Sequence, residues 1–253
     1  MFGREGDPFL NLDHFRMRGP TFPPHAHAGF SAVTYLLPES AGGMRNRDGR
    51  GDRSLIHAGG LHWTAAGSGL VHEEVPEPDG VVAEGLQIFV RQPSEQERMA
   101  PVIHHLEPDE LPRLTIGEGA WVRVIAGSFG GARAPIEPPS PLQLLDVALS
   151  PGTGIEWRNP WPAAGATIYL FSGAIDIDGE QAAAPAAIVC ARGTPDLHIA
   201  ATIGDARFVL LAGEPLDVPT VSNGPFAFSS VEALDDAVAR YRRGEMGSIA
   251  QGS

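Results

Sequence analysis

Short apolar runs, each about the length of one strand, recur along the chain and are separated by turn-forming residues. Clear examples are Phe30–Leu37, Gly85–Val90, Trp121–Ala126, Leu142–Leu149 and Thr167–Phe171. Asp-Gly and Ser-Pro-Gly sequences lie between such runs, and the 253 residues include 31 glycines and 23 prolines. Tight turns favour Gly and Pro, and β-branched and aromatic residues are common in several of the runs. The pattern predicts an all-β fold, a sandwich or a barrel.

One Gly- and Pro-rich passage, residues 130–141 (GGARAPIEPPSP), interrupts the series of apolar runs. We therefore expect a first domain at residues 1–130, a linker at 131–141 and a second domain at 142–253, each domain of ordinary size. Two successive β domains of similar length suggest a duplication, although no repeat is visible in the sequence.

A single helix is predicted at residues 230–243, at the end of the second domain. Ser229 and Glu232 have the spacing of a capping box, and apolar residues follow at helical intervals. Gly244 follows a turn rich in arginine, which is where a helix is expected to end.

The ionisable residues are unusual in kind as well as in number. The formal net charge is −13, and all 18 basic residues are arginine. The lack of lysine excludes Schiff-base chemistry and a P-loop lysine. The acidic balance argues against direct binding to nucleic acid or to an anionic membrane. With Cys190 as the single cysteine, no intrachain disulfide and no multi-cysteine metal site can form.

The sequence shows no secretory signal and no apolar stretch long enough to cross a membrane, so we expect a cytoplasmic protein.

Two histidine dyads predict a metal site. They are His25-Ala26-His27 and His72-Glu73-Glu74, and eight of the nine histidines precede residue 106. In an extended strand, side chains two residues apart project from the same face. Neighbouring strands would thus offer three nitrogens from His25, His27 and His72 and one carboxylate oxygen from Glu74.

This ligand set suits one divalent first-row metal with open coordination positions. Fe(II) is the most natural choice, and Mn, Co, Ni, Cu and Zn are the alternatives. An isolated His-x-His pair is more often a surface feature than a ligand pair, so the prediction depends on both dyads together. His57 and His62 lie just before the second dyad and either line the same cavity or are structural.

The dyads sit in motifs that resemble those of the cupins, and more closely those of the pirin family, which are two-domain cupins. Gly19-x5-His25-x-His27 matches the first cupin motif, and Gly69-x2-His72 matches part of the second. The order and spacing agree from about residue 10 to residue 243. The pirin-like segments are FPPHAHAGFSAVTYLL (22–37), HWTAAGSGLVHEEVP (62–76), GLQIFVRQP (85–93) and GEPLDVPTVSNGPF (213–226).

The resemblance implies a bicupin of two jelly-roll-like β-barrels with a metal only in the N-terminal one. The family's ligands are both histidines of His-x-His and the His and Glu of His-x-Glu, which here are His25, His27, His72 and Glu74. Glu73 should face away from the metal. Family members are often monomers, which is the expectation for this chain.

The resemblance also implies an activity. Several pirin-like proteins act on quercetin, opening the flavonol ring with dioxygen and releasing carbon monoxide. A small planar phenol or enediol and dioxygen are therefore the expected substrates, with Glu74 as the base that accepts the substrate's hydroxyl proton. One alternative is a non-enzymatic iron-dependent regulator that binds a transcription factor or a metabolic enzyme. Another is a different cupin reaction, such as an isomerisation or the oxidation of a catechol.

Several positions near the predicted metal depart from the family pattern. Ala28 replaces an arginine, Ser31 a glutamate and His62 a glutamine, which bears on the substrate more than on the metal. The arginine-rich stretch 44–53 is expected at the tip of a hairpin, as a solvated loop or as a contact for an anion or partner. Finally, Phe22, Phe30 and Trp63 either flank a planar substrate or belong to the barrel core.

Overall fold

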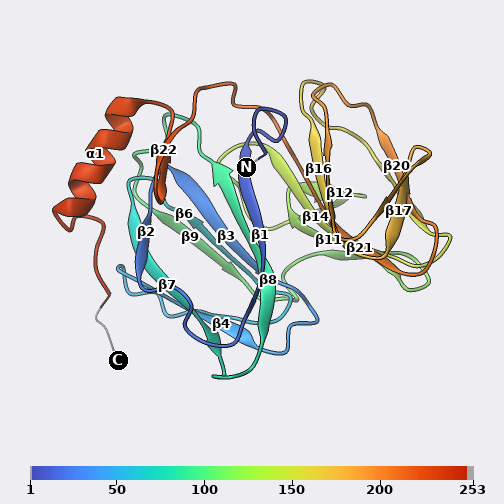
Figure 1. Ribbon diagram of the computed structural model, residues 1–253, viewed down its shortest axis with the longest axis horizontal. Coiled ribbons are helices and arrows are strands. Elements are labelled where there is room, and N and C mark those ends of the chain that lie inside the picture. Colours follow the sequence, from blue (N-terminus) through green and yellow to red (C-terminus); the bar gives the residue numbers. More distant parts are fainter. Residues whose placement is uncertain (1, 250–253) are drawn as a thin grey trace. The chain divides into compact units, whose positions relative to one another are not determined.

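The computed structural model describes residues 2–249 and divides them into two compact units built almost entirely of antiparallel strands (Figure 1). The first unit comprises residues 10–110 together with the C-terminal segment from residue 217 onward, and the second comprises residues 2–9 and 111–216. The all-β fold with one C-terminal helix is therefore confirmed.

Two sheets form the body of the first unit. Across the five-stranded sheet the order is β1 (Phe9–Met17), β8 (Ala83–Arg91), β3 (Phe30–Leu36), β6 (Leu61–Ala65) and β9 (Val102–Leu106). Across the four-stranded sheet it is β2 (His25–His27), β7 (Leu70–Glu77), β4 (Gly43–Asp48) and β5 (Leu55–Ile56). Every residue of β3 is buried, which explains why its sequence is a nearly continuous apolar run.

Strand β4 shows how the arginine-rich stretch is accommodated. Met44, Asn46 and Asp48 are buried, whereas Arg45 and Arg47 lie on the opposite, more exposed face. Arg45 forms a bidentate ion pair with a glutamate of β7 (Nε–Oε 2.6 Å), and Arg47 contacts the carboxylate directly across the strand pair. The stretch 44–53 thus contains β4 and the turn toward β5, so the predicted hairpin is present and part of it is strand.

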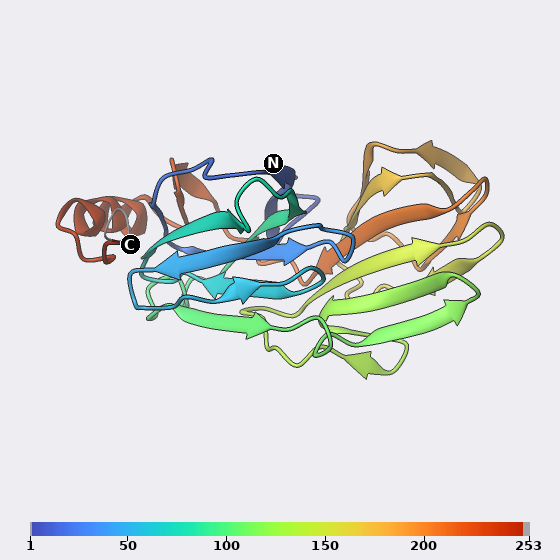
Figure 2. The same cartoon turned by 90° about the horizontal axis from the view of Figure 1, so that it is seen from below.

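The second unit has a six-stranded and a four-stranded sheet, whose strands Figure 2 shows in two layers, coloured from green to orange. The larger sheet has the order β10 (Arg113–Gly117), β11 (Ala120–Ala126), β14 (Leu142–Leu149), β21 (Ala206–Gly213), β16 (Ala166–Ser172) and β19 (Ala186–Cys190). The smaller has β15 (Gly154–Trp157), β20 (Leu197–Ala201), β17 (Ala174–Ile177) and β18 (Glu180–Ala183), and a short hairpin joins β12 (Ser128–Phe129) to β13 (Ala132–Arg133).

The structure divides the chain at different points from the predicted boundary. Strands β10 and β11 precede the expected linker, yet β11 pairs with β14 in the large sheet of the second unit. The passage 131–141 contains β13 and the buried side chains of Ala134 and Ile136, so it belongs to the second unit and is not a free linker. Gly130 and Gly131, both with positive φ, form the turn between β12 and β13.

Both ends of the described chain also depart from the expected domains. Residues 2–9 belong to the second unit, where the backbone N–H of Arg192 donates to Glu5 and its guanidinium lies 3.4 Å from Asp7. The C-terminal segment belongs to the first unit, where it forms the hairpin of β22 (Val221–Asn223) and β23 (Phe226–Phe228) and then helix α1 (Val231–Arg242).

Helix α1 covers one side of the four-stranded sheet of the first unit. Its buried residues Ala233, Leu234 and Ala237 share an apolar cluster with Ala26 of β2 and Val71 of β7. The predicted cap is displaced by one residue. Ser230, not Ser229, is the N-cap and accepts the backbone N–H of Ala233, whereas the Ser229 hydroxyl donates to Glu97 (2.8 Å).

Candidate metal centre

The pairing of β2 with β7 brings the two histidine dyads together. His25 lies directly opposite His72 in this antiparallel pair, so both side chains share a face with His27, two residues further along β2. The intervening Ala26 and Val71 point to the opposite face and pack in the cluster under α1. The alternation of side chains thus places imidazoles on the inner face and small apolar groups against the helix.

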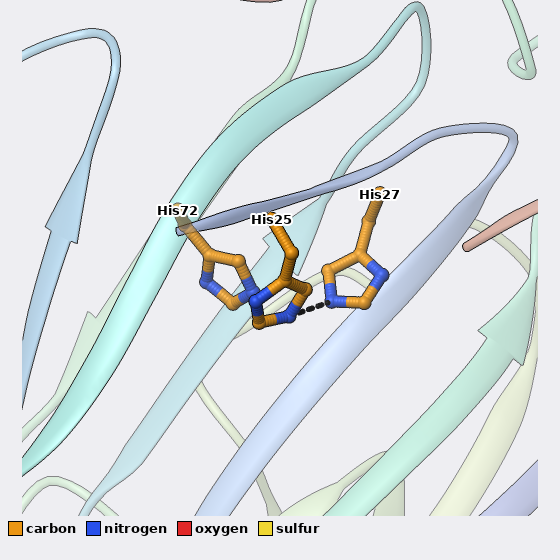
Figure 3. Close-up of side chains that lie close together, drawn as sticks. All are labelled: His25, His27 and His72. Atoms are coloured by element: carbon orange, nitrogen blue, oxygen red, sulfur yellow. Dashed lines mark hydrogen bonds between the residues drawn. The ribbon is translucent and has the colours of Figure 1, made fainter. Parts of the chain in front are cut away.

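Figure 3 shows the three imidazole rings converging on a common space. Their centroids are 4.8 Å apart for His25–His27, 4.8 Å for His25–His72 and 4.9 Å for His27–His72. One nitrogen from each ring can be chosen so that the three lie within 4.8 Å of one another. His27 and His72 are buried and His25 is half-buried, so the cluster opens to one side.

Neighbouring oxygens select the protonated nitrogen on two of the rings. Nδ1 of His25 lies 3.1 Å from the carbonyl oxygen of Pro23, and Nδ1 of His72 lies 3.3 Å from Oδ1 of Asn46. Both oxygens can only accept, so each Nδ1 carries the proton and each Nε2 keeps a free lone pair. Among the described residues, Nδ1 of His27 and Nε2 of His72 are buried with no hydrogen-bond partner.

Burial keeps the inner histidines neutral. Loss of hydration lowers the pKa of His27 to about 3, and the proximity of His25 adds to this effect. Burial, followed by the neighbouring histidines, also holds the pKa of His72 well below its usual value. Neutral imidazole is the form that binds a metal ion, so these residues present ligands without first having to lose a proton at neutral pH.

The donor set fits a divalent metal ion. Nε2 of His25 and Nε2 of His27 face each other at 3.1 Å. Two nitrogens that each lie about 2.0–2.1 Å from one ion, with an N–metal–N angle between roughly 90° and 109°, would be about 2.8–3.4 Å apart. Two neutral lone pairs at this distance repel each other unless a proton or a cation lies between them. The spacing of these two nitrogens, together with the buried and unpartnered Nε2 of His72, therefore fits a divalent cation.

Gly69 explains the spacing of the second motif. It has φ +115°, and a Cβ at this position would lie only 2.4 Å from Sδ of Met246 in the C-terminal segment. A residue with a side chain would be strained in this conformation and would also clash with Met246. Glycine therefore lets the chain enter β7 at the angle that places His72 opposite His25.

Glu74, the fourth expected ligand, lies in the same cavity but outside the three-nitrogen group. Both carboxylate oxygens are 2.8 Å from the hydroxyl of Thr34, which is on β3. Burial raises the pKa of Glu74 to about 7, and the Thr34 hydroxyl partly opposes this shift. The structure thus brings three of the four expected ligands together and places the fourth beside them.

A cavity of about 390 Å³ opens from the histidines, which is within the range of small-molecule sites. It extends between the two sheets of the first unit, and most of its lining is apolar. Besides the four expected ligands, its lining residues are Asp13, Phe15, Met17, Phe22, Met44, Gln87 and Phe89.

Of the three aromatic residues proposed to flank a substrate, only Phe22 lines this cavity. Its side chain is 60% exposed at the mouth, and its ring lies 6.4 Å from that of His25. Phe30 is buried against His27 and Phe89, and Trp63 is buried in the core. The alternative reading as barrel core therefore applies to Phe30 and Trp63.

Sequence reasoning did not identify Gln87 and Phe89, which are on β8. They alternate with the buried Leu86, Ile88 and Val90 in the run GLQIFV, so strict alternation would have placed them on a common face. The missing information was that this face borders a cavity instead of solvent.

The remaining histidines of the first unit do not line the cavity. His57 is exposed and pairs with Glu107 (Nδ1–Oε2 2.8 Å), and His62 is buried beside His105 (Nδ1–Nδ1 3.4 Å). His104 and His105 lie on β9, opposite Trp63 and His62. In the second unit, His198 pairs with Glu156 at the surface.

Glu73 faces away from the cluster and contacts Arg47, as expected. Within residues 2–249, no helix is both long and apolar enough to cross a membrane.

Family models match most of the chain. A model described as "Pirin" covers residues 3–90, and one described as "Pirin C-terminal cupin domain" covers residues 144–247. Pirin-1 of Arabidopsis thaliana is 34% identical over 249 residues, covering 95% of this chain and 84% of the relative. A Pseudomonas aeruginosa protein provisionally named quercetin 2,3-dioxygenase is 34% identical over 250 residues, covering 94% and 86%.

Solved structures agree with this relationship. The chain is similar to a crystal structure of quercetin 2,3-dioxygenase from Acinetobacter baumannii, with a TM-score of 0.88, 27% identity and coverage of 98% and 89% of the two chains. A bacterial pirin from Escherichia coli in complex with nickel(II) shares the fold, with a TM-score of 0.67, 16% identity and coverage of 84% and 85%.

Two cupin-type β units, one of which carries a His-rich site able to hold a metal, define a two-domain cupin. Within that class the chain belongs to the pirin family, as its motifs indicated.

Proposed function

We propose that this chain is a dioxygenase that uses one divalent metal, Fe(II), to oxidise a quercetin-like flavonol or a related phenol. One observation carries the proposal. Three neutral imidazoles converge at the end of a largely apolar cavity of about 390 Å³ whose wall also contains the Glu74 carboxylate. The names of the Pseudomonas and Acinetobacter proteins support the same reaction class.

His25, His27 and His72 would hold the metal through their Nε2 atoms, with Glu74 as the fourth ligand or as a group beside it. The metal would act as a Lewis acid that favours the ionised form of the substrate hydroxyl and would serve as the centre for dioxygen chemistry. Neutral nitrogens and a carboxylate suit Fe(II), and the open side of the cluster leaves room for substrate.

The chain's own residues supply the remaining requirements. An oxygen of Glu74 accepts the hydroxyl proton of the substrate, and Thr34 holds that carboxylate in the cavity wall. Phe22 and Phe89 present aromatic surfaces to a planar ring, and the apolar lining excludes water from the reacting atoms. With a flavonol, the ring-opened ester and carbon monoxide together contain all the atoms of the flavonol and of one dioxygen.

The test is oxygen consumption by anaerobically purified protein that has been reconstituted with Fe(II) and supplied with quercetin. We expect quercetin-dependent oxygen uptake and release of carbon monoxide, both lost in His25→Ala. His57→Ala is the matched control, because this histidine lies outside the cavity and should retain activity.

The outcomes separate the proposed functions. Retention of iron without oxygen uptake for a panel of flavonols and catechols would contradict the dioxygenase and favour the regulatory alternative. Failure of the wild-type protein to bind any divalent metal would contradict both.

A further inference from the structure

Asn46 is a fully buried polar residue whose side chain ends beside a predicted metal ligand. It lies on β4, with an exposed fraction of 0%, and its Oδ1 lies 3.3 Å from Nδ1 of His72. On the neighbouring strand β7, Asn46 is opposite Glu74, so its side chain shares the inner face with both dyad residues. Among the described residues, Asn46 is therefore the hydrogen-bond partner of this nitrogen of His72.

The amide of Asn46 is itself held in one orientation. Its Nδ2 donates to Oδ2 of Asp52 at 2.7 Å. A carboxylate can only accept, so the NH2 group must point to Asp52 and the carbonyl oxygen must point to His72. A flipped amide would place a donor against Nδ1–H of His72 and would leave Asp52 facing an oxygen.

Asp52 is in turn anchored by Ser54, the residue that follows the arginine-rich stretch. It accepts the backbone N–H of Ser54 (3.0 Å) and the hydroxyl of Ser54 (2.7 Å). Burial alone would raise the pKa of Asp52, but these bonds and the one from Asn46 outweigh burial and lower it. Asp48 supports the same turn by accepting the backbone N–H groups of Arg50 and Asp52.

We propose that Asn46 is a positioning residue for the metal ligand His72 and that Asp52 fixes the amide that performs this role. The inference rests on the metal of the proposed function. In the resulting chain, Asp52 orients Asn46, Asn46 accepts the Nδ1 proton of His72, and Nε2 of His72 is left as a ligand of fixed direction. An acceptor of this kind both orients a ligand imidazole and raises its basicity.

The turn between β4 and β5 carries the residue that orients Asn46. Arg45 and Arg47 of β4 pair with glutamates on the outer face. On the other side, Asp48 at the end of β4 holds the turn, and Asp52 in the turn holds the amide of Asn46. His25 has a comparable acceptor in the carbonyl of Pro23, but that acceptor is backbone and cannot be removed by substitution. Asn46 is therefore the position at which the support of the ligands can be tested.

The experiment measures the affinity of the full chain for Co(II) by competition with a chelator, together with the visible absorption of the bound Co(II). We expect Asn46→Ala to weaken Co(II) binding by about 10–100-fold, the usual effect of removing such a partner, and to alter the absorption bands. Arg45→Gln is the matched control. It changes the same strand on its outer face and should leave the affinity within about twofold of wild type.

A rescue variant separates positioning from a general loss of packing. The double variant Asn46→Asp, Asp52→Asn exchanges the carboxylate and the amide. The new carboxylate at position 46 can still accept the Nδ1 proton of His72, and the new amide at position 52 can donate a hydrogen bond to that carboxylate. We expect this pair to recover most of the Co(II) affinity and the wild-type absorption bands. Asp52→Ala keeps Asn46 but frees its amide, so it should bind Co(II) more weakly than wild type.

Each result decides a specific point. Wild-type affinity in Asn46→Ala, or no recovery in the double variant, would overturn the role of Asn46. If Asn46→Ala does not fold, the comparison of Asp52→Ala with the double variant decides in its place. If the wild-type chain itself fails to bind Co(II), the metal centre and the role of Asn46 both fall, and this outcome is seen before any variant is compared.

Discussion

The hydroxyl of Thr34 lies 2.8 Å from each carboxylate oxygen of Glu74, and this contact connects the two sheets of the first unit. Thr34 is on β3 and Glu74 is on β7, forty residues away in the sequence. The hydroxyl has one proton to donate, and Oε1 of Gln87 at 3.1 Å is a third acceptor within reach, but the two shorter contacts keep the Glu74 carboxylate turned toward β3. Glu74 therefore has a defined resting position beside the histidine cluster.

Replacing Thr34 should release this carboxylate. In Thr34→Val we expect kcat for oxygen uptake with quercetin to fall by about tenfold or more, because a misdirected base transfers protons poorly. Thr34→Ser retains the hydroxyl and should recover most of the rate. A purely structural effect would lower both variants alike, and a Thr34→Val enzyme with wild-type kcat would show that the contact has no role in turnover.

Glu74→Gln should separate proton transfer from the binding of the metal by the histidines. We expect the variant to retain Fe(II), measured by metal analysis after anaerobic dialysis, because the three imidazoles remain. We expect turnover to fall by about 10²–10⁴-fold, the usual contribution of a general base. Full turnover together with retained metal would exclude Glu74 as the base.

Phe22 should affect substrate binding more than chemistry. Its ring is exposed at the mouth of the cavity, so its removal should not disturb the packing of the core. In Phe22→Ala we expect KM for quercetin to rise by roughly threefold to tenfold, corresponding to a lost aromatic contact of about 0.5–1.5 kcal/mol. Metal content and kcat should change little, and an unchanged KM would mean that the ring does not contact the substrate.

His62 should make the metal-free protein less stable in acid. Burial lowers the pKa of His62 to about 4, with the charge of His105 adding to this effect and Asp52 and Asp48 opposing it. As the pH falls below the usual value of 6.5, the unfolded chain takes up a proton at this position before the folded chain does. The free energy of unfolding therefore decreases, by about 2 kcal/mol at pH 5 relative to pH 7.5.

The comparison is a pair of urea titrations in the presence of a chelator, for wild type and His62→Gln. The substitution removes the proton uptake, so the variant should lose less stability between pH 7.5 and pH 5 than wild type does. Equal losses in the two proteins would contradict the assignment.

Ser230 should be the residue that caps α1. Its side chain accepts the backbone N–H of Ala233 at 3.2 Å. In Ser230→Ala, opening of the first turn should cost about 1 kcal/mol less, so amide hydrogen exchange at Ala233 should accelerate by roughly fivefold. Ser230→Asp can still accept this bond and should exchange like wild type, whereas fast exchange in both variants would show that the side chain is not the cap.

The helix illustrates how local and distant information differ. Its range of 230–243 was predicted within one residue at each end, because apolar spacing and terminal arginines are properties of the segment itself. The identity of the cap and the unit that the helix covers were not predictable in this way. Both depend on partners far away in the chain, namely Glu97 for Ser229 and the backs of β2 and β7 for the buried face.

The candidate site also combines features that local sequence determines with features that depend on distant residues. The sequence alone determined that His25 and His27 would share a face, since strand periodicity sets the direction of neighbouring side chains, and its motifs indicated the pirin family. The tertiary structure decided that His72 lies opposite His25, that Thr34 holds Glu74 and that Asn46 supports His72. These relationships join residues from different strands, and strand register and sheet packing, which no local pattern encodes, bring them within hydrogen-bond distance.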